Sequence, residues 1–118
     1  MQRRSFAILF FALAACEGHP GSPPLPFELL TPTEASATAP TTPTLTWKLS
    51  PRALNYTLEI ATDSAFTAIV FTQPDILVTT FTLTAPLAVG TVHFWRVTAV
   101  NVNGPTPCTA PFSFTTTP

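Results

Sequence analysis

The chain has 118 residues, of which 46% are hydrophobic and 9% are charged, and its formal net charge is -1 at pH 7. Its five cationic residues are scattered, and two of them, Arg3 and Arg4, lie at the very start. This excludes the clustered Lys and Arg that nucleic-acid binding requires. About a hundred residues follow the first segment, which suffices for one domain with a modest core and excludes two.

The first residues have the three parts of an export signal: a basic start at residues 1–4, an apolar core at residues 6–15 and small residues at the exit. A membrane-spanning helix needs about 20 apolar residues, so a core of about ten that stops before Glu17 is too short to span. The core ends on Leu13-Ala14-Ala15-Cys16, which resembles a bacterial lipobox. We therefore expect residues 1–15 to be a cleaved lipoprotein signal peptide.

The lipobox resemblance implies that Cys16 becomes the first residue of the mature chain. It would carry a thioether-linked diacylglycerol, usually with a further acyl chain such as palmitate on its amino group. Because burial of each methylene contributes about 0.8 kcal/mol, two or three such chains anchor a protein to a membrane effectively permanently. Glu17 replaces the aspartate associated with inner-membrane retention, which favours the outer membrane of a bacterial cell envelope. The alternative is an ordinary signal that ends at Ala12-x-Ala14, which gives a secreted soluble protein with an unmodified Cys16.

The chain has two cysteines, Cys16 and Cys108. Acylation of Cys16 predicts an unpaired thiol at Cys108. We interpret Cys108 as a small, partly buried hydrophobe, because nothing basic stands beside it in the sequence to activate the thiol. In the soluble alternative the two cysteines could form a disulfide, which an oxidising compartment permits.

A proline-rich linker is expected at residues 16–27, starting at the lipidated cysteine. Dense prolines favour extended polyproline geometry, so about ten residues at roughly 3.1 Å each would hold the domain about 30 Å from the lipid. A first edge strand is expected at residues 27–30. The Thr, Pro and Ala-rich stretch at residues 31–44 is compatible with further linker.

From residue 45 onward, apolar and polar residues alternate with period two, which predicts half-buried strands, and turn signals separate them. Six or seven short strands in about 90 residues predict an all-β, immunoglobulin-like two-sheet sandwich over residues 28–118. A further, less regular strand is expected at residues 68–72. The expected inward-facing sets are Leu45, Trp47 and Leu49; Tyr56, Leu58 and Ile60; Phe81 and Leu83; Trp95, Val97 and Ala99; and Phe112 and Phe114.

A specific motif order runs through these strands. The residues that carry it are Trp47, then Tyr56-x-Leu58-x-Ile60, then Leu87-x-x-Gly90-Thr91-x-His93-Phe94-Trp95-Arg96-Val97-x-Ala99-Val100-Asn101-x-x-Gly104. From about Leu29 to Thr116, the chain resembles a bacterial fibronectin type III domain. The resemblance implies about seven strands, with Trp47 filling the core between two sheets and the later run leading into the penultimate strand.

The family's corner tyrosine falls where this chain has His93. We expect His93 to be a core or corner residue that stands in for tyrosine and donates from one ring nitrogen. Burial there should disfavour the charged imidazolium. Replacing His93 by Tyr should then be neutral or stabilising.

Catalytic constellations are sparse in the sequence. A Cys108 and His93 nucleophile pair lacks a placed Asn or Asp to orient the ring. The carboxylates Glu59, Asp63 and Asp75 are too dispersed for a catalytic pair. No zinc, calcium or phosphate-loop spacing occurs. We therefore expect a protein that is not an enzyme and has no cofactor or metal.

The candidate contact face lies on the later strands. If Trp95 and its alternate neighbours point inward, then Phe94, Arg96 and Thr98 point outward, with Glu59 opposite on the neighbouring strand. An aromatic beside an arginine is typical of protein interfaces and sugar platforms. The alternative is an ordinary outer sheet face with a cross-strand Arg96 and Glu59 pair.

These observations predict a lipid-anchored cell-envelope protein whose single sandwich binds or scaffolds envelope proteins or polysaccharide without catalysis. The membrane is the first partner, through lipidated Cys16. The alternative is an accessory or spacer module of a secreted carbohydrate-active or proteolytic enzyme system. A remnant of a longer gene is a third possibility, because such modules commonly recur in tandem.

Overall fold

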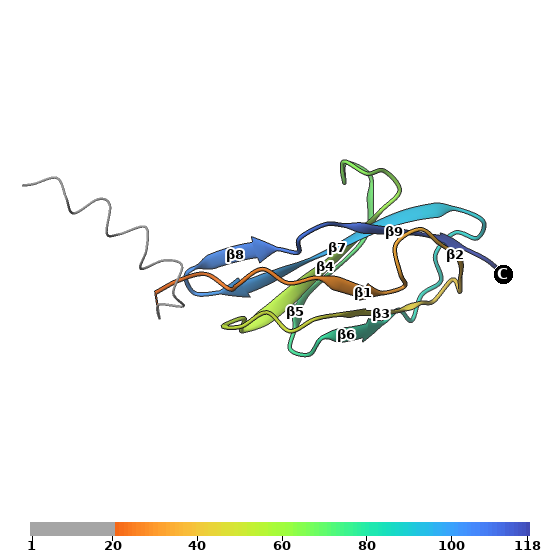
Figure 1. The fold of residues 1–118 in the computed structure, drawn as a ribbon. Coiled ribbons are helices and arrows are strands. Elements are labelled where there is room, and N and C mark those ends of the chain that lie inside the picture. The colour runs from red at the N-terminus through yellow and green to blue at the C-terminus, as the bar shows by residue number, and fades with distance from the viewer. Residues whose placement is uncertain (1–20) are drawn as a thin grey trace, which may run out of the picture.

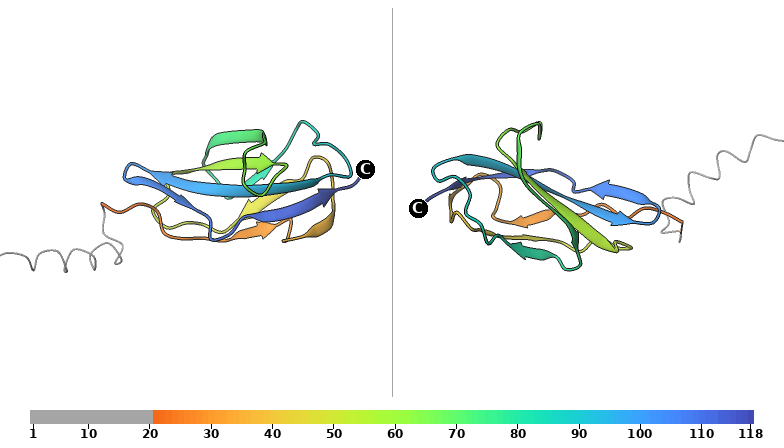
Figure 2. Two further views of the ribbon diagram at one scale, coloured as in Figure 1. Left: turned by 90° about the horizontal axis from the view of Figure 1, so that it is seen from above. Right: turned by 180° about the vertical axis from the view of Figure 1, so that it is seen from behind.

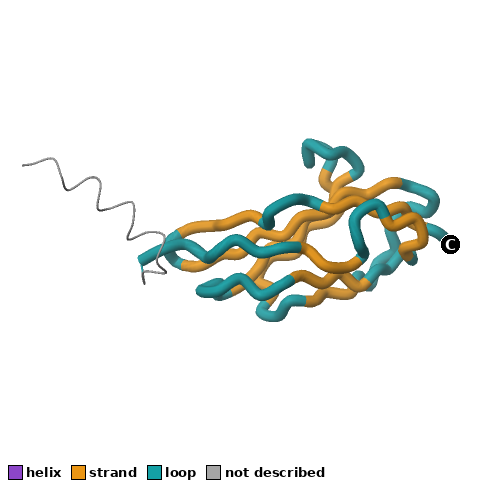
Figure 3. Tube along the Cα trace, viewed as in Figure 1, coloured by secondary structure: helices purple, strands orange, loops and turns teal. Residues whose placement is uncertain are grey.

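A computed structural model describes residues 21–118, which form two packed sheets (Figure 1). Cys16 and the expected leader, residues 1–15, lie outside the described residues. No helix occurs within residues 21–118, so strands and loops make up all of the described chain (Figure 3). The strands are β1 (Leu29–Thr31), β2 (Ser36–Ala39), β3 (Thr44–Trp47), β4 (Asn55–Ala61), β5 (Ile69–Ile76), β6 (Thr80–Thr82), β7 (Val92–Asn101), β8 (Gly104–Pro107) and β9 (Phe112–Thr116).

The smaller sheet has the order β1-β3-β6, and the larger has the order β2-β9-β7-β4-β5 with β8 also paired to β7. All pairings are antiparallel except the parallel pair of β2 and β9. Figure 2 shows the two sheets stacked face to face, with the end of the chain opposite the start of the described part. The predicted all-β two-sheet sandwich is confirmed.

Nine strands occur among the described residues, where about seven were expected. One additional strand is β2. It lies within residues 31–44, whose composition was compatible with further linker. Its residues Ser36 and Ala39 pair with Phe114 and Thr116 of β9, so the stretch becomes a sheet edge through a contact far along the chain. The other addition arises because the last strand is interrupted: β8 and β9 both pair with β7, at its two ends.

The core lies between the sheets and follows the predicted alternation on β4 and β7. Tyr56, Leu58 and Ile60 of β4 are buried. Trp47 of β3 is buried as well and meets Tyr56 edge to face, with ring centroids 5.6 Å apart. Since β3 and β4 belong to different sheets, Trp47 fills the space between them, as the resemblance implied.

The prediction that Leu49 faces inward is wrong, because this side chain is 71% exposed. Strand β3 ends at Trp47, and the alternation therefore does not continue through residue 49. The chain turns at Ser50, whose amide donates to the Tyr56 hydroxyl at 2.9 Å. This contact across the turn sets the path of the backbone after Trp47.

Residues 22–27, which were expected to be linker, are packed onto the sandwich. The Phe27 ring is 4% exposed and lies 5.8 Å from the ring of Tyr56. The Leu25 amide donates to the Pro51 carbonyl at 3.1 Å, and the Thr106 hydroxyl donates to the Pro24 carbonyl at 2.7 Å. The packed body therefore begins near residue 22, upstream of the expected boundary at residue 28.

Candidate functional site

The outer side of β4 and β7 carries the predicted contact residues. The register of the two strands sets Glu59 opposite Arg96, and Thr57 opposite Thr98. Phe94, Arg96 and Thr98 are half-buried, whereas the alternate residues Trp95, Val97 and Ala99 are fully buried toward the core. The predicted orientation of these side chains is therefore confirmed.

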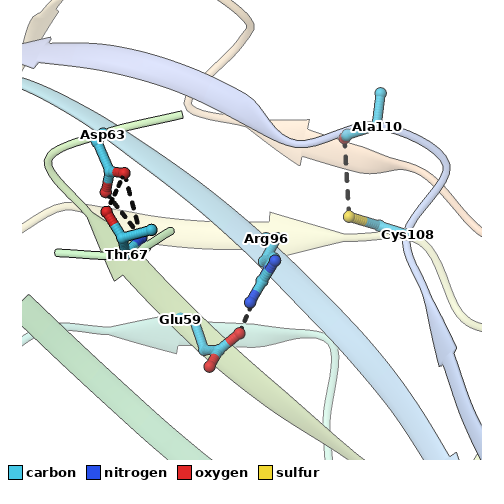
Figure 4. A network of polar contacts seen from close by, with 6 residues as sticks. All are labelled: Glu59, Asp63, Thr67, Arg96, Cys108 and Ala110. Atoms are coloured by element: carbon cyan, nitrogen blue, oxygen red, sulfur yellow. Dashed lines mark hydrogen bonds and ion pairs between the residues drawn. The ribbon is translucent and has the colours of Figure 1, made fainter. Parts of the chain in front are cut away.

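Arg96 and Glu59 form an ion pair across the two strands (Figure 4). The Arg96 Nε donates to Glu59 Oε1 at 2.7 Å. Both side chains are partly exposed, so water screens the pair and its contribution to stability is about 0.2–1 kcal/mol. The cross-strand pairing of Arg96 with Glu59, which was expected from the sequence, is therefore confirmed.

Phe66, in the loop between β4 and β5, covers Arg96 from outside. The Arg96 guanidinium carbon lies 4.1 Å from the centroid of the Phe66 ring, which is a cation–π contact. The Phe66 side chain is buried although its residue belongs to a surface loop, and its φ is 57°. Phe66 could not be predicted from the sequence. The residues Asp63-Ser64 before it favour a turn, but a turn does not reveal which face of the sheet its loop covers.

Asp63 holds this loop closed (Figure 4). Its carboxylate accepts hydrogen bonds from the Thr67 amide at 3.0 Å and the Ala68 amide at 2.9 Å, and from the Thr67 hydroxyl at 2.6 Å. The pKa of the exposed Asp63 carboxyl is lowered from its ordinary value, and the hydrogen bond from the Thr67 hydroxyl is the largest cause. The Thr62 amide also donates to the Ala68 carbonyl, which closes the loop at its base.

His93 is buried beside Phe114, with the two rings stacked 5.6 Å apart. Its Nδ1 lies 3.1 Å from the Thr91 carbonyl oxygen. A carbonyl can only accept, so Nδ1 carries the proton in this contact. Burial lowers the pKa of His93 and the Thr91 bond opposes it, which agrees with the expected disfavour for imidazolium.

A second ring-to-backbone bond was missed in the sequence. Tyr56 accepts the buried Ser50 amide through its hydroxyl, across the turn between β3 and β4. The only sequence signal was a tyrosine six residues after Ser50. Tyr56 and His93 thus each form a hydrogen bond between the side chain and a backbone group of a nearby residue.

Cys108 is buried, and burial raises the pKa of its thiol above the ordinary value. Its Sγ lies 3.7 Å from the Ala110 carbonyl oxygen (Figure 4), and its amide donates to Val97 of β7. His93 lies four residues before Val97 on that strand, about 13 Å along it, so the structure does not bring Cys108 and His93 together. Cys108 has no disulfide partner within residues 21–118.

The described residues contain no group of three or more His, Cys, Asp or Glu side chains that could hold a metal ion. Between residues 21 and 118, no helix is long and apolar enough to cross a membrane.

No family model matches this chain, and no curated protein matches it. Solved structures similar to it include the following two. An Fn3-like protein from Clostridium thermocellum is 22% identical with a TM-score of 0.58, and the match covers 82% of this chain and 94% of that chain. The structure of FN3tt is 20% identical with a TM-score of 0.49, over 79% of this chain and 92% of that chain. The first likeness shows that the chain has a fibronectin type III-like fold.

Proposed function

We propose that this protein is a lipid-anchored component of the bacterial cell envelope, most consistent with an outer-membrane address. Its sandwich serves non-catalytic binding or scaffolding of an envelope protein or polysaccharide. The observation that carries the proposal is the order of the chain: a Leu13-Ala14-Ala15-Cys16 lipobox is followed after only five residues by a segment packed on a fibronectin type III-like sandwich.

Internal contacts of the reactive side chains support a non-catalytic role. Arg96 is engaged by Glu59 and Phe66, and the Asp63 carboxylate is satisfied within its own loop. His93 and Cys108 are buried, and burial favours the neutral form of each. Each of these groups is thus engaged or buried within the described part of the fold.

The outer side of β4 and β7 is the surface best suited to a partner. Phe94 and Thr98 lie there beside the Arg96 side chain, which its contacts with Glu59 and Phe66 hold in one place. A surface that is already ordered loses little side-chain entropy on binding. An aromatic and an arginine side by side suit either a protein or a sugar ring.

The anchor is tested by the intact mass of the protein from the membrane fraction, compared with a Cys16→Ala variant. The wild-type chain should lose residues 1–15 and gain the mass of a diacylglyceryl group and an amide-linked acyl chain. The variant should lack the added mass. A wild-type chain that loses its leader without gaining lipid would contradict the anchor.

A thiol count tests the same claim independently. Acylation removes Cys16 from the count, so one thiol should react after unfolding, and it should react slowly in the folded protein because Cys108 is buried. No thiol in the unreduced protein would instead indicate a Cys16 to Cys108 disulfide and the secreted alternative.

The contact face is tested with a photo-crosslinking residue at Thr98, and with Thr82 of the smaller sheet as the matched control. The lipidated protein is used with intact envelopes and with isolated envelope polysaccharide. Crosslinks from position 98 but not from position 82 are expected. A crosslink from position 98 to a hydrolase would favour the accessory-module alternative, and equal labelling from both positions would reject this face.

A further inference from the structure

Exposed apolar side chains are concentrated in the loops at one end of the sandwich. Among the described residues, ten large apolar side chains are exposed, and the five most exposed all lie in three loops. These loops are residues 48–54 between β3 and β4, residues 77–79 between β5 and β6, and residues 102–103 between β7 and β8. The five are Val102 (87%), Leu77 (76%), Leu49 (71%), Leu54 (62%) and Val78 (58%).

Hydrogen bonds show that the three loops are neighbours. The Leu54 amide donates to the Val100 carbonyl at 2.8 Å, and the Asn101 side-chain amide donates to the Arg52 carbonyl at 3.1 Å. These bonds join the first loop to the third. The Trp47 amide donates to the Thr79 carbonyl at 3.1 Å, which joins the end of β3 to the second loop. We call the five side chains on these loops the apolar tip.

The described chain begins at the same end. Ser22 is held there by the turn between β7 and β8, because its carbonyl accepts from the side-chain amides of Asn101 at 3.1 Å and Asn103 at 3.5 Å. Figure 1 shows this turn beside the start of the described part, with the last residue at the far end of the sandwich. The segment that leads back to Cys16 therefore leaves the domain next to the apolar tip.

Cys16 precedes Ser22 by six residues in the sequence. Six residues span at most about 20 Å when fully extended. This is less than the roughly 30 Å expected when all of residues 16–27 were counted as a free linker, since residues 22–27 are docked. A lipid on Cys16 thus keeps the tip within reach of the bilayer surface at a high effective concentration, where weak insertion suffices.

Both cations near the tip have partners within the domain, whereas one carboxylate there is exposed. Lys48 pairs with Glu28 at 3.3 Å. Arg52 turns back, donating through Nη2 to the Pro23 carbonyl of the docked segment at 3.1 Å. Asp75 is exposed and precedes Leu77, so the loop between β5 and β6 should lie shallower than the other two.

We propose that the apolar tip inserts into the headgroup and acyl boundary of the same bilayer that holds Cys16. Side chains of Leu and Val on loop ends are favourable in that layer, and the nearby anchor removes most of the cost of association. The sandwich then stands on the membrane with the outer side of β4 and β7 facing sideways and its far end facing away. The inference rests on the proposed lipid anchor.

The test uses the lipidated mature protein in vesicles of phosphatidylethanolamine and phosphatidylglycerol. A polarity-sensitive fluorophore is attached at Val102→Cys or Leu54→Cys in a Cys108→Ala background. Val89→Cys is the matched control, because Val89 is also an exposed valine but lies at the opposite end, where the Gly90 amide bonds the Thr116 carbonyl. Blue-shifted emission and quenching by spin-labelled lipids, several-fold stronger at positions 102 and 54 than at 89, are expected.

Hydrogen exchange on the unsubstituted protein provides a second measurement, should Cys108→Ala disturb folding. Vesicles should slow exchange in residues 48–54 and 102–103, relative to the Cys16→Ala protein in solution, and leave residues 84–91 unchanged.

The outcomes separate the two proposals. A protein without lipid overturns the anchor and the insertion together. A lipidated, vesicle-bound protein whose tip is neither quenched nor protected overturns only the insertion. Tip protection that grows with protein density and shows no lipid quenching would mean that a second copy covers the tip, and this also overturns the insertion.

Discussion

The guanidinium of Arg96 is held between the Phe66 ring, 4.1 Å from its centroid, and the Glu59 carboxylate, 2.7 Å from its Nε. The three residues come from β7, the loop after β4 and β4 itself. Their contacts tie the loop to the outer side of the sheet. The candidate contact face is therefore an internally braced surface, and its order depends on Phe66.

Replacing Phe66 by Ala should destabilise the domain by about 1–3 kcal/mol, because it removes buried apolar area and the cation–π contact. Urea unfolding of wild type and variant measures the change. Phe66→Leu is the matched control, since it keeps most of the apolar contact and loses only the ring face. Equal stability of Phe66→Ala and wild type would contradict the bracing role.

Asp63→Asn should loosen the loop between β4 and β5 while leaving the sandwich folded. The amide keeps one oxygen acceptor but loses the charge that strengthens the bonds from Thr67 and Ala68. Amide hydrogen exchange should accelerate at these two positions. Because the folded pKa of Asp63 is below its ordinary value of 3.8, loop protection in the wild type should be complete above that pH and fall as the pH drops through the folded pKa. Protection of the Thr67 and Ala68 amides that does not change with pH in this range would argue against a role of the Asp63 carboxylate.

Stability should fall at mildly acidic pH because of His93. The folded pKa is below the ordinary value of 6.5, so the unfolded chain binds a proton first as the pH falls. The contribution of neutral His93 to the unfolding free energy is complete above about pH 6.5. It decreases as the pH falls from there to the folded pKa. His93→Phe keeps a ring against Phe114 and removes the titration, so its unfolding free energy should lack this slope. An identical slope in the variant would exclude His93 as the cause.

His93→Tyr tests the corner assignment. If His93 stands in for a tyrosine, the variant should melt at the same temperature as the wild type or higher. Thermal unfolding above pH 7 measures this without the titration. A large drop in melting temperature would reject the assignment and indicate a site shaped for imidazole.

Tyr56→Phe should cost about 1–3 kcal/mol, because the buried Ser50 amide loses its acceptor while the apolar contacts of the ring remain. Chemical unfolding measures the loss. Ser50→Ala is an informative comparison: it leaves the Tyr56 bond and removes the hydroxyl bond to the Leu25 carbonyl. An unchanged unfolding free energy in Tyr56→Phe would mean that another acceptor reaches the amide.

Much of the fold follows from local properties of the chain. A strand's side chains alternate between its two faces whatever it pairs with, so the apolar residues of β4 and β7 could be assigned to the core in advance. The same alternation placed Phe94, Arg96 and Thr98 outside. The short apolar core and lipobox-like end of the leader are also local, and they are the basis of the proposed anchor.

Only the tertiary structure decided the contacts between distant segments. Strand β2 exists through its pairing with β9, and residues 22–27 are ordered by partners such as Thr106 far along the chain. Leu49 is exposed because β3 ends at Trp47 and the chain turns at Ser50, where the Ser50 amide donates to the Tyr56 hydroxyl. Phe66 covers Arg96, and the tip lies beside the departing chain, because strand register and loop packing bring them there. Side-chain alternation repeats every two residues and can be read along one strand, whereas register and docking depend on which segments meet in space.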